Sequence, residues 1–120
     1  MAESSLQIAR LPTLRPCRTL RPGALDASHY RSVPELAFAR FRATPDRLAA
    51  RVCVGRGDSQ SWQSYTWGET ASHVARFARG LTALGFQRGH RLGLFGVTTP
   101  EWTHGFLAAQ FLGGVAARVA

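Results

Sequence analysis

The clearest pattern of apolar and polar residues lies in the middle of the chain and predicts an amphipathic helix. Thr66 and, three residues later, Glu69 form a capping box, in which each side chain accepts a hydrogen bond from the other residue's backbone N–H. Behind them, apolar residues recur at helical spacings of three and four: Ala71, Val74, Ala75, Phe77, Ala78, Leu81 and Leu84. Gly85 stands where a left-handed C-terminal cap belongs, so we predict a helix of about five turns with one apolar face.

A short strand and a second helix are predicted next. After a turn at residues 87–90, residues 91–96 contain the leucines and the phenylalanine typical of a short, largely buried strand. Thr98 or Thr99 can then cap a helix with Pro100 at its first position, where the missing N–H of proline costs nothing.

The last elements indicate the fold class. Two glycines at 113 and 114 end the second helix, and residues 115–120 predict another strand. The helical connection between the two strands is long enough for a parallel crossover. The predicted fold class is therefore α/β, with a helix–strand–helix–strand unit and parallel strands.

The region before this unit predicts a short helix and a hairpin. Ser32 with Glu35 makes a second capping box that opens a helix through about Arg42. Residues 50–54 and 61–66 have the pattern of two strands joined by a glycine-containing loop. The loop includes an arginine-glycine-aspartate triplet, which we interpret as a plain turn and not as a cell-adhesion signal, since no secretory signal is recognised.

Short phrases within these elements resemble a known family. In chain order they are Tyr65-Thr66-Trp67 with Glu69, Phe77-Ala78-Arg79-Gly80-Leu81, Leu84-Gly85, Gly89-His90-Arg91-Leu92, Pro100-Glu101-Trp102 and Gly113-Gly114-Val115. Together they resemble the amino-terminal region of the AMP-forming acyl-CoA synthetases of the adenylate-forming superfamily, and most of all the long-chain fatty acyl-CoA ligases. The resemblance covers residues 32 to 120. Within it, His90 replaces a usual aspartate, Thr98 stands near a usual asparagine, and Arg118 stands where the last strand normally reaches proline.

The resemblance implies an activity for a longer parent protein. Such ligases bind ATP with Mg²⁺, join it to a fatty acid to give an acyl-adenylate and pyrophosphate, and transfer the acyl group to coenzyme A. Their triphosphate site is a serine-, threonine- and glycine-rich loop ending in lysine, and a second lysine lies in a small C-terminal domain. Neither segment is found here, and the chain has no lysine. We therefore assign no catalytic, cofactor-binding or metal-binding residue and expect the 120-residue chain alone to be inactive.

The charge of the chain does not change this interpretation. The net charge of +8 comes from fifteen arginines against seven acidic residues. A basic chain can bind nucleic acid through phosphate contacts, but these arginines are scattered and form no stripe along one element. We attribute them to a base-composition bias and predict no nucleic-acid partner.

Cysteine usage and hydropathy indicate the compartment. Cys17 and Cys53 make neither a disulfide framework nor a zinc-binding spacing, which favours a reducing environment. The longest apolar run, residues 105–117, is too short to span a bilayer. We expect a location that is cytoplasmic or peripheral to a membrane, with the organelle left open.

The two ends of the chain differ in composition. Residues 1–31 contain several prolines and arginines without a sustained period, and we interpret them as a flexible N-terminal arm. A transit peptide is the alternative, although Glu3 and the lack of an amphipathic helix argue against it. The resemblance implies that residues 32–120 form the N-terminal part of an AMP-binding domain, which we expect to be truncated after its last strand.

Several residues were considered as a functional site. Residues 93–96 lead from a strand to a helix N-terminus but lack both the three-glycine pattern and a lysine, so we predict a tight turn and not a nucleotide site. The four histidines have no metal-ligand spacing; His73 is expected on the solvated side of its helix and His104 near an exposed face. Trp67 and Trp102, each near a helix start, are expected to pack as anchors.

These observations favour a fragment of a long-chain fatty acid–CoA ligase whose partner is the remainder of the ligase domain. A parallel sheet that ends after its last predicted strand would leave apolar helix faces and a strand edge uncovered. This predicts either aggregation or a partner that covers them. The alternative is a small non-enzymatic interaction module derived from the same fold.

Overall fold

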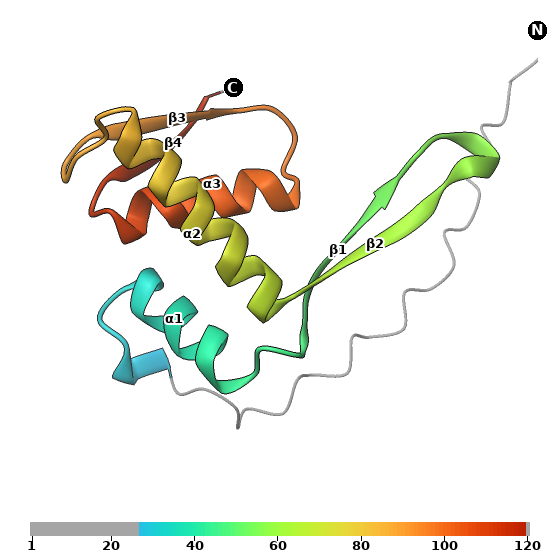
Figure 1. Cartoon of the computed structure of the whole chain (residues 1–120), viewed down its shortest axis with the longest axis horizontal. Helices are drawn as coiled ribbons and strands as arrows, with labels where there is room; N and C mark the ends of the chain where they lie inside the picture. Colours follow the sequence, from blue (N-terminus) through green and yellow to red (C-terminus); the bar gives the residue numbers. More distant parts are fainter. Residues whose placement is uncertain (1–26, 120) are drawn as a thin grey trace, which may run out of the picture.

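The computed structural model describes residues 27–119 as a mixed helix and strand structure (Figure 1). The elements in chain order are η1 (Ala27–His29), α1 (Val33–Ala43), β1 (Leu48–Val54), η2 (Gly57–Ser59), β2 (Ser61–Thr66), α2 (Trp67–Ala83), β3 (Arg91–Phe95), α3 (Pro100–Phe111) and β4 (Val115–Val119). Most of the predicted arm at residues 1–31, and with it the transit-peptide alternative, lies outside the described residues.

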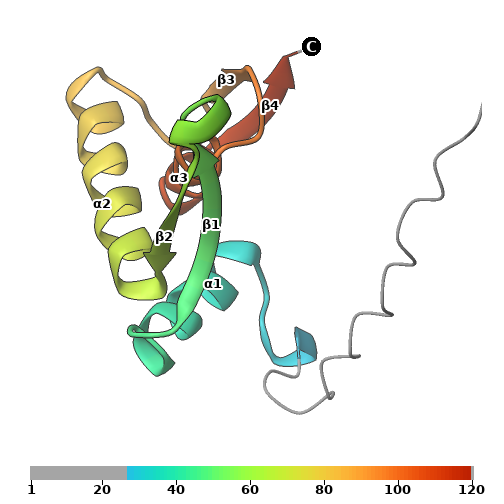
Figure 2. The same ribbon diagram turned by 90° about the vertical axis from the view of Figure 1, so that its right-hand side faces the viewer.

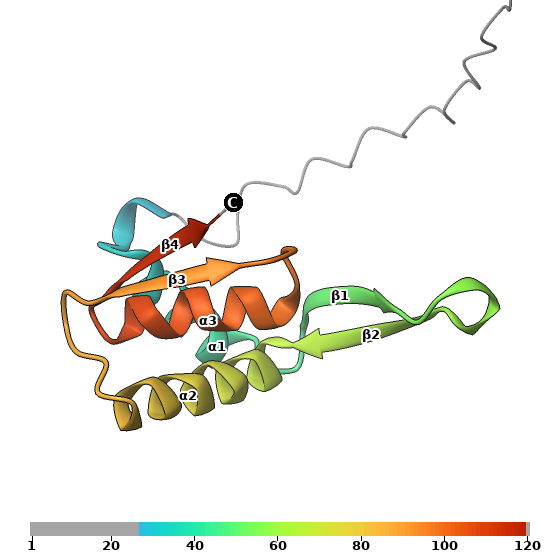
Figure 3. The same ribbon diagram turned by 90° about the horizontal axis from the view of Figure 1, so that it is seen from above.

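The elements from α2 onward are arranged in layers (Figure 3). The helix α3 lies between α2 on one side and the strand pair β3–β4 on the other. The strands β3 and β4 pair in parallel, from Arg91 opposite Val115 to Phe95 opposite Val119. The predicted α/β class with parallel strands is thus confirmed.

The start of α2 has the predicted capping box. Thr66 Oγ1 accepts a hydrogen bond from the Glu69 N–H at 3.1 Å, and Glu69 Oε2 accepts one from the Thr66 N–H at 2.8 Å. At the other end, Gly85 has a φ of +87°, a left-handed conformation in which a Cβ atom would be strained. Both signals therefore mark the helix ends as predicted.

The buried face of α2 is narrower than its apolar pattern suggests. Val74 and Leu81 are buried together with Leu107 and Ala108 of α3 and form the centre of the core. Leu84, expected on the same face, is 87% exposed because it follows the last residue of α2 as the C-cap and no neighbouring element covers that end.

The helix α1 begins with an altered form of the predicted cap. Ser32 Oγ accepts a hydrogen bond from the Glu35 N–H at 3.3 Å. Glu35 Oε2 accepts from the N–H of Arg31 at 2.8 Å, one residue earlier than a capping box requires. Two orphan donors are still satisfied, so α1 starts at Val33.

Backbone hydrogen bonds connect the loop that follows α1 to the start of α2. The Trp67 N–H donates to the Arg47 carbonyl at 2.9 Å, and the Gly68 N–H donates to the Pro45 carbonyl at 2.8 Å. In Figure 2, α1 accordingly lies beside the first turns of α2 and the base of the hairpin.

The strands β1 and β2 form an antiparallel hairpin that projects from the helices (Figure 1). Most of its side chains are exposed, including Trp62 at 63%. The arginine-glycine-aspartate triplet lies at its tip, where η2 makes the turn that we predicted.

One face of the β3–β4 pair is apolar and uncovered. Leu92, Leu94 and Ala116 are half-buried and alternate with exposed neighbours, as expected for strands with one packed face. The uncovered face, which we call the outer sheet face, contains Phe95, Val115 and Val119 at 80%, 53% and 49% exposure, the small residues Gly93 and Ala117 between them, and the exposed Arg91 opposite Val115 at one end. Apolar faces and open strand edges of this kind favour association.

We expect the 120-residue chain to self-associate through the outer sheet face. Replacing Phe95→Thr and Val115→Thr together should shift it toward monomer, because threonine favours strands but exposes less apolar surface. Sedimentation velocity over a range of concentrations measures this shift. Val54→Thr, on the hairpin and 38% exposed, is the matched control that should leave association unchanged. A wild-type chain that is monomeric at every concentration would contradict the prediction.

The contribution of the α2 capping box to stability can be measured in the variant that carries both Phe95→Thr and Val115→Thr, which we call the double-threonine variant. Thr66→Ala should lower the free energy of unfolding by about 1 kcal/mol, because the N–H of Glu69 loses its acceptor. Urea denaturation provides the value. Thr82→Ala, in the exposed last turn of α2, is the control and should cost nothing, since alanine has the higher helix propensity. Equal losses for the two variants would argue against a functional cap.

Candidate functional site

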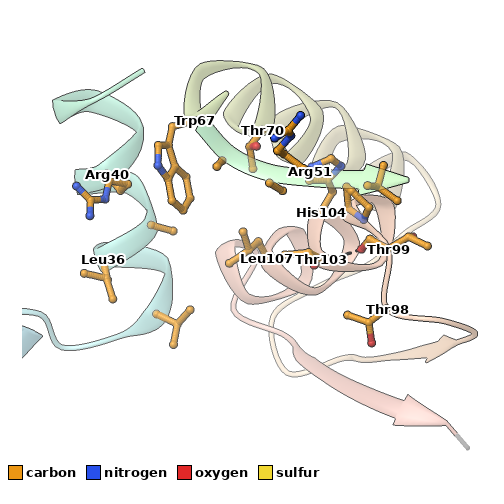
Figure 4. A pocket seen from close by; sticks show the side chains of 16 residues that line it. Leu36, Arg40, Arg51, Trp67, Thr70, Thr98, Thr99, Thr103, His104 and Leu107 are labelled. Atoms are coloured by element: carbon orange, nitrogen blue, oxygen red, sulfur yellow. Dashed lines mark hydrogen bonds between the residues drawn. The ribbon is translucent and has the colours of Figure 1, made fainter. Parts of the chain in front are cut away.

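A groove of about 610 Å³ lies between α1, β1 and α3 (Figure 4). We call it the α1–α3 groove. Its α1 side carries the aliphatic Val33, Leu36 and Ala37, and its α3 side carries the polar Thr103 and His104 together with the aliphatic Leu107. Sequence reasoning missed this groove, because its walls come from elements that are far apart along the chain.

Two arginines line the α1–α3 groove without a carboxylate partner. Arg40 Cζ lies 5.9 Å from the ring centroid of Trp67, and Arg51 Cζ lies 5.5 Å from that of Trp62. Neither guanidinium forms an ion pair within residues 27–119. Each is therefore positioned by an indole ring and retains its hydrogen-bond donors.

The two tryptophans proposed as anchors do pack against aromatic neighbours. Trp67 is half-buried, with its ring centroid 6.1 Å from that of Phe41, and it also lines the groove. Trp102 stacks on Phe106 at 5.7 Å with an interplanar angle of 10°. Its Nε1 is buried and makes no hydrogen bond within the described part of the chain.

Next to the groove, four residues from β2, α2 and α3 form what we call the histidine cluster: Tyr65, His73, Glu101 and His104. The two imidazole rings are stacked, with centroids 5.0 Å apart and an interplanar angle of 3°. The Tyr65 ring lies edge-on to both at 5.8 Å, and its hydroxyl donates to Glu101 Oε1 at 3.3 Å.

Burial and neighbouring charges shift the pKa values of three cluster residues. Burial lowers the pKa of His104, which is 4% exposed, and the charge of His73 lowers it further, while Glu101 opposes both. Burial and the nearby Glu101 carboxylate raise the pKa of Tyr65. Hydrogen bonds from the backbone N–H of Glu101 itself, and then from Thr99, lower the pKa of the Glu101 carboxyl. The cluster therefore contains a neutral buried imidazole next to an ionised carboxylate at neutral pH.

The positions of the histidines correct one expectation and support another. His73 is exposed on α2, as predicted, although its ring covers that of His104. His104 is not near an exposed face but buried, because α3 is covered by α2 on one side and by the strands on another. Within residues 27–119, no serine, threonine or cysteine side chain is hydrogen-bonded to the imidazole of His73 or His104.

The tight turn predicted at residues 93–96 is wrong for most of this segment, because Gly93 to Phe95 belong to β3 and pair with β4. The chain leaves the strand only at Gly96, which has a φ of +120°. Thr99 is the N-cap of α3, and Glu101 lies in its first turn. The Glu101 carboxylate thus already complements the helix N-terminus where an anion would bind. That this segment is no nucleotide site stays a prediction.

The described residues do not fit a magnesium–triphosphate group. Within residues 27–119, no three histidine, cysteine, aspartate or glutamate side chains lie close enough together to hold a metal ion. The sequence also supplies no lysine. In the same range, none of the helices has the length and apolar content needed to cross a membrane.

Comparison with known proteins identifies the family. Residues 38–120 match the sequence family described as AMP-binding enzyme, which is well over half of the chain. The chain belongs to the AMP-binding enzymes. The matched region begins within α1 and includes the whole of α2, β3, α3 and β4. The predicted relationship to the adenylate-forming superfamily is thereby confirmed.

Two curated relatives are similar to this AMP-binding chain over part of their length. The long-chain-fatty-acid–CoA ligase ACSBG2 of Rattus norvegicus is 29% identical over 84 residues, which are 70% of this chain and 12% of the rat protein. The 4-coumarate–CoA ligase-like 9 of Oryza sativa subsp. japonica is 39% identical over 59 residues, which are 49% of this chain and 10% of that protein. The chain thus spans a small part of either relative.

Solved structures share the fold of the AMP-binding chain. The fatty acid AMP ligase from Legionella pneumophila superimposes with a TM-score of 0.67 at 17% identity, over 80% of this chain and 16% of that one. The N-terminal subdomain of NpsA from Klebsiella oxytoca gives 0.61 at 22% identity, over 73% and 21%. The described elements therefore correspond to one part of a larger ligase fold.

The buried His104 should make the stability of the chain depend on pH. Its folded pKa lies below the ordinary value of 6.5, so the unfolded chain gains a proton first as the pH falls. Stability should decrease from pH 6.5 down to the folded pKa, with no further loss from this group below it and none above 6.5. Urea denaturation of the double-threonine variant, from about pH 5 to about pH 8, measures this trend.

His73→Gln provides a matched variant for this prediction. Removing the charge of His73 should raise the pKa of His104 toward its ordinary value and weaken the pH dependence. His90→Gln, at an exposed position outside the cluster, should leave the titration of His104 unchanged. Imidazole NMR signals report each titration directly, and a His104 that titrates at or above its ordinary pKa would exclude the described burial.

Proposed function

We propose that this chain is a scaffold segment of a long-chain fatty acid–CoA ligase. The parent protein would form an acyl-adenylate from ATP and a fatty acid and then a thioester with CoA. The observation that supports this most is the match of residues 38–120 to the AMP-binding enzymes. The similarity to a relative named as a long-chain-fatty-acid–CoA ligase supports the substrate class.

The role proposed for this segment is structural and not catalytic. Its residues offer no lysine and no described metal-binding cluster, so ATP, Mg²⁺ and CoA would be held by parts of the parent outside this chain. The segment supplies the packed unit of α2, α3 and the β3–β4 pair. Further helices and strands of the parent protein would pack against this unit. The 120-residue chain alone is accordingly proposed to be inactive.

The proposed partner is the remainder of the ligase domain. The outer sheet face is apolar and exposed, with Phe95 at 80%, and the matched structures are several times longer than this chain. Covering that face would bury apolar surface at about 25 cal/mol per Å². A cytoplasmic or membrane-peripheral location is proposed with it.

A chimera tests the scaffold role. Residues 38–120 of this chain would replace the matched 84-residue segment of the rat ligase. Because the segment is proposed to hold no catalytic group, the chimera should retain fatty-acid-dependent exchange of pyrophosphate into ATP within about tenfold of the parent, a change of about 1.4 kcal/mol in barrier. The 120-residue chain alone should show no exchange.

Two further variants of the chimera sharpen this test. Leu107→Asp places a charge in the core next to Val74 and should abolish both folding and exchange. Val54→Thr, on the exposed hairpin, should leave exchange unaffected. A chimera that folds and binds ATP but has no exchange activity would refute the scaffold role and favour the non-enzymatic interaction module.

A further inference from the structure

We propose that residues 4–9 of this chain add as a third strand to the open edge of β1 and place Leu6 and Ile8 in the α1–α3 groove. This interface lies within one chain, so the inference goes beyond the proposed ligase function and does not depend on it. Three observations support it: an unpaired strand edge at the groove, an apolar groove lining, and a matching pattern in a segment that can reach both.

The edge of β1 that faces away from β2 is open. The sheet has two strands, and within residues 27–119 the backbone of β1 forms hydrogen bonds to β2 alone. Four consecutive residues of β1, 49–52, line the groove. Because side chains alternate between the two faces of a strand, such a run means that the groove follows the backbone at the edge of β1. Open N–H and C=O groups at a strand edge are a template for one more strand.

The groove beside this edge is lined mainly by apolar side chains (Figure 4). Val33, Leu36 and Ala37 come from α1, and the half-buried Ala50 and Val52 come from β1. Val33 is 50% exposed, so it has apolar surface left to cover. An apolar side chain from an added strand would remove this surface from water.

Residues 4–9 have the pattern of such a strand. They precede the described residues, and they belong to the arm that the sequence predicted to be flexible. Within residues 1–26 they are the longest stretch without charge, proline or glycine. Leu6 and Ile8 alternate with Ser5 and Gln7, which is the period of a strand with one apolar and one polar face.

The rest of the preceding chain fits the groove less well. Residues 10–26 contain four arginines and three prolines. The lining of the groove contains no aspartate or glutamate that could pair with these arginines. Proline also cannot donate to the ladder of a sheet. The uncharged stretch at 4–9 is therefore the part that matches both the edge and the groove.

The two faces of the hairpin agree with the two faces of the added strand. Ala50 pairs with Tyr65, and both are at least half-buried, whereas the next pair, Arg51 and Ser64, is exposed. A third strand continues these two faces. Its leucine and isoleucine would lie on the face that carries Ala50, and its serine and glutamine would lie in solvent.

The covalent connection can span the distance to the groove. The described chain begins at Ala27, shortly before Val33, which lines the groove. Residues 10–26 can extend over roughly 55 Å, at about 3.3 Å per residue. The whole of α1 is only about 16 Å long, at about 1.5 Å per residue. The segment can therefore reach β1 of its own chain, and the tether favours its own chain over a second copy.

The single isoleucine of the chain makes a direct test possible. Methyl labelling of isoleucine in the double-threonine variant of the full 120-residue chain gives one NMR signal, from Ile8. We expect nuclear Overhauser contacts from this methyl group to those of Val33 and Val52. An Ile8 methyl group with a random-coil shift and no such contacts would overturn the inference and leave the groove to another part of the parent protein.

Hydrogen exchange tests the added strand itself. The β1 amides that do not donate to β2 should exchange at least tenfold more slowly in the double-threonine variant than after the further changes Leu6→Ser and Ile8→Ser. The matched control is Leu11→Ser with Leu14→Ser, on either side of Pro12, which should change exchange less than twofold. Equal acceleration by the two pairs of changes would contradict a specific strand.

Two variants of α1 test the groove side of the interface. Val33 and Phe38 are exposed to similar extents, 50% and 52%, but only Val33 lines the groove. Val33→Glu should abolish the slow exchange and the Ile8 contacts, because its carboxylate would face an apolar side chain. A glutamate is favourable in the first turn of a helix, so α1 should persist. Phe38→Glu should change neither readout. Slow exchange that survives Val33→Glu would place the segment elsewhere.

A concentration series distinguishes this arrangement from a strand exchanged between two copies. Within one chain, the slow exchange of β1 should not depend on protein concentration. Slow exchange that increases with concentration would assign the edge to a second copy and overturn the inference. These measurements contain no nucleotide, so their result stands apart from the pyrophosphate-exchange test of the proposed function.

Discussion

The structure depends above all on the close packing of α3 against α2 and the β3–β4 pair. Ala108 and Ala109 are 0% exposed, and no larger side chain separates the layers there. One turn earlier, a Cβ atom added to Gly105 would lie 3.2 Å from both Leu94 Cδ2 and Phe77 Cζ. Small residues on α3 thus allow the helix to be covered from both sides at the density of a protein interior. The positions of α2 and of both strands follow from this contact.

The burial of His104 is a consequence of the same packing. It lies one helical turn before Ala108, on a helix with few solvent-facing positions. A charged imidazole is costly in such a place, which is why its pKa is lowered. The stacked ring of His73 covers it on the α2 side and provides an aromatic contact in place of water. The cluster is thus best explained as the way this fold accommodates a polar residue within the α2–α3 contact.

Local signals in the sequence predicted the helices and strands. Two predictions that were wrong concern which side chains are buried, and burial depends on tertiary packing. The capping box of Thr66 and Glu69 and the proline at 100 depend on neighbouring residues only, so the helix starts were predicted within a residue. The exposure of Leu84 and the burial of His104 depend on which element lies opposite, and α3 is apolar on most sides, so no polar face marks its orientation. The groove was beyond sequence reasoning for the same reason, since α1, β1 and α3 meet only in the folded chain.

Arg40 and Arg51 have no carboxylate partner, in part because the glutamates of the described residues form hydrogen bonds elsewhere. Each of the three glutamates in the described residues lies in the first turn of a helix: Glu35 in α1, Glu69 in α2 and Glu101 in α3. There they accept hydrogen bonds from backbone N–H groups or from the Tyr65 hydroxyl, so they are engaged away from the guanidinium groups. Helix capping therefore engages these three carboxylates, and the other two acids of residues 27–119, Asp46 and Asp58, form no ion pair with Arg40 or Arg51 in that range either. With fifteen arginines against seven acidic residues, the chain keeps a net charge of +8, and the indole contacts of Arg40 and Arg51 show how such cations are packed without a carboxylate.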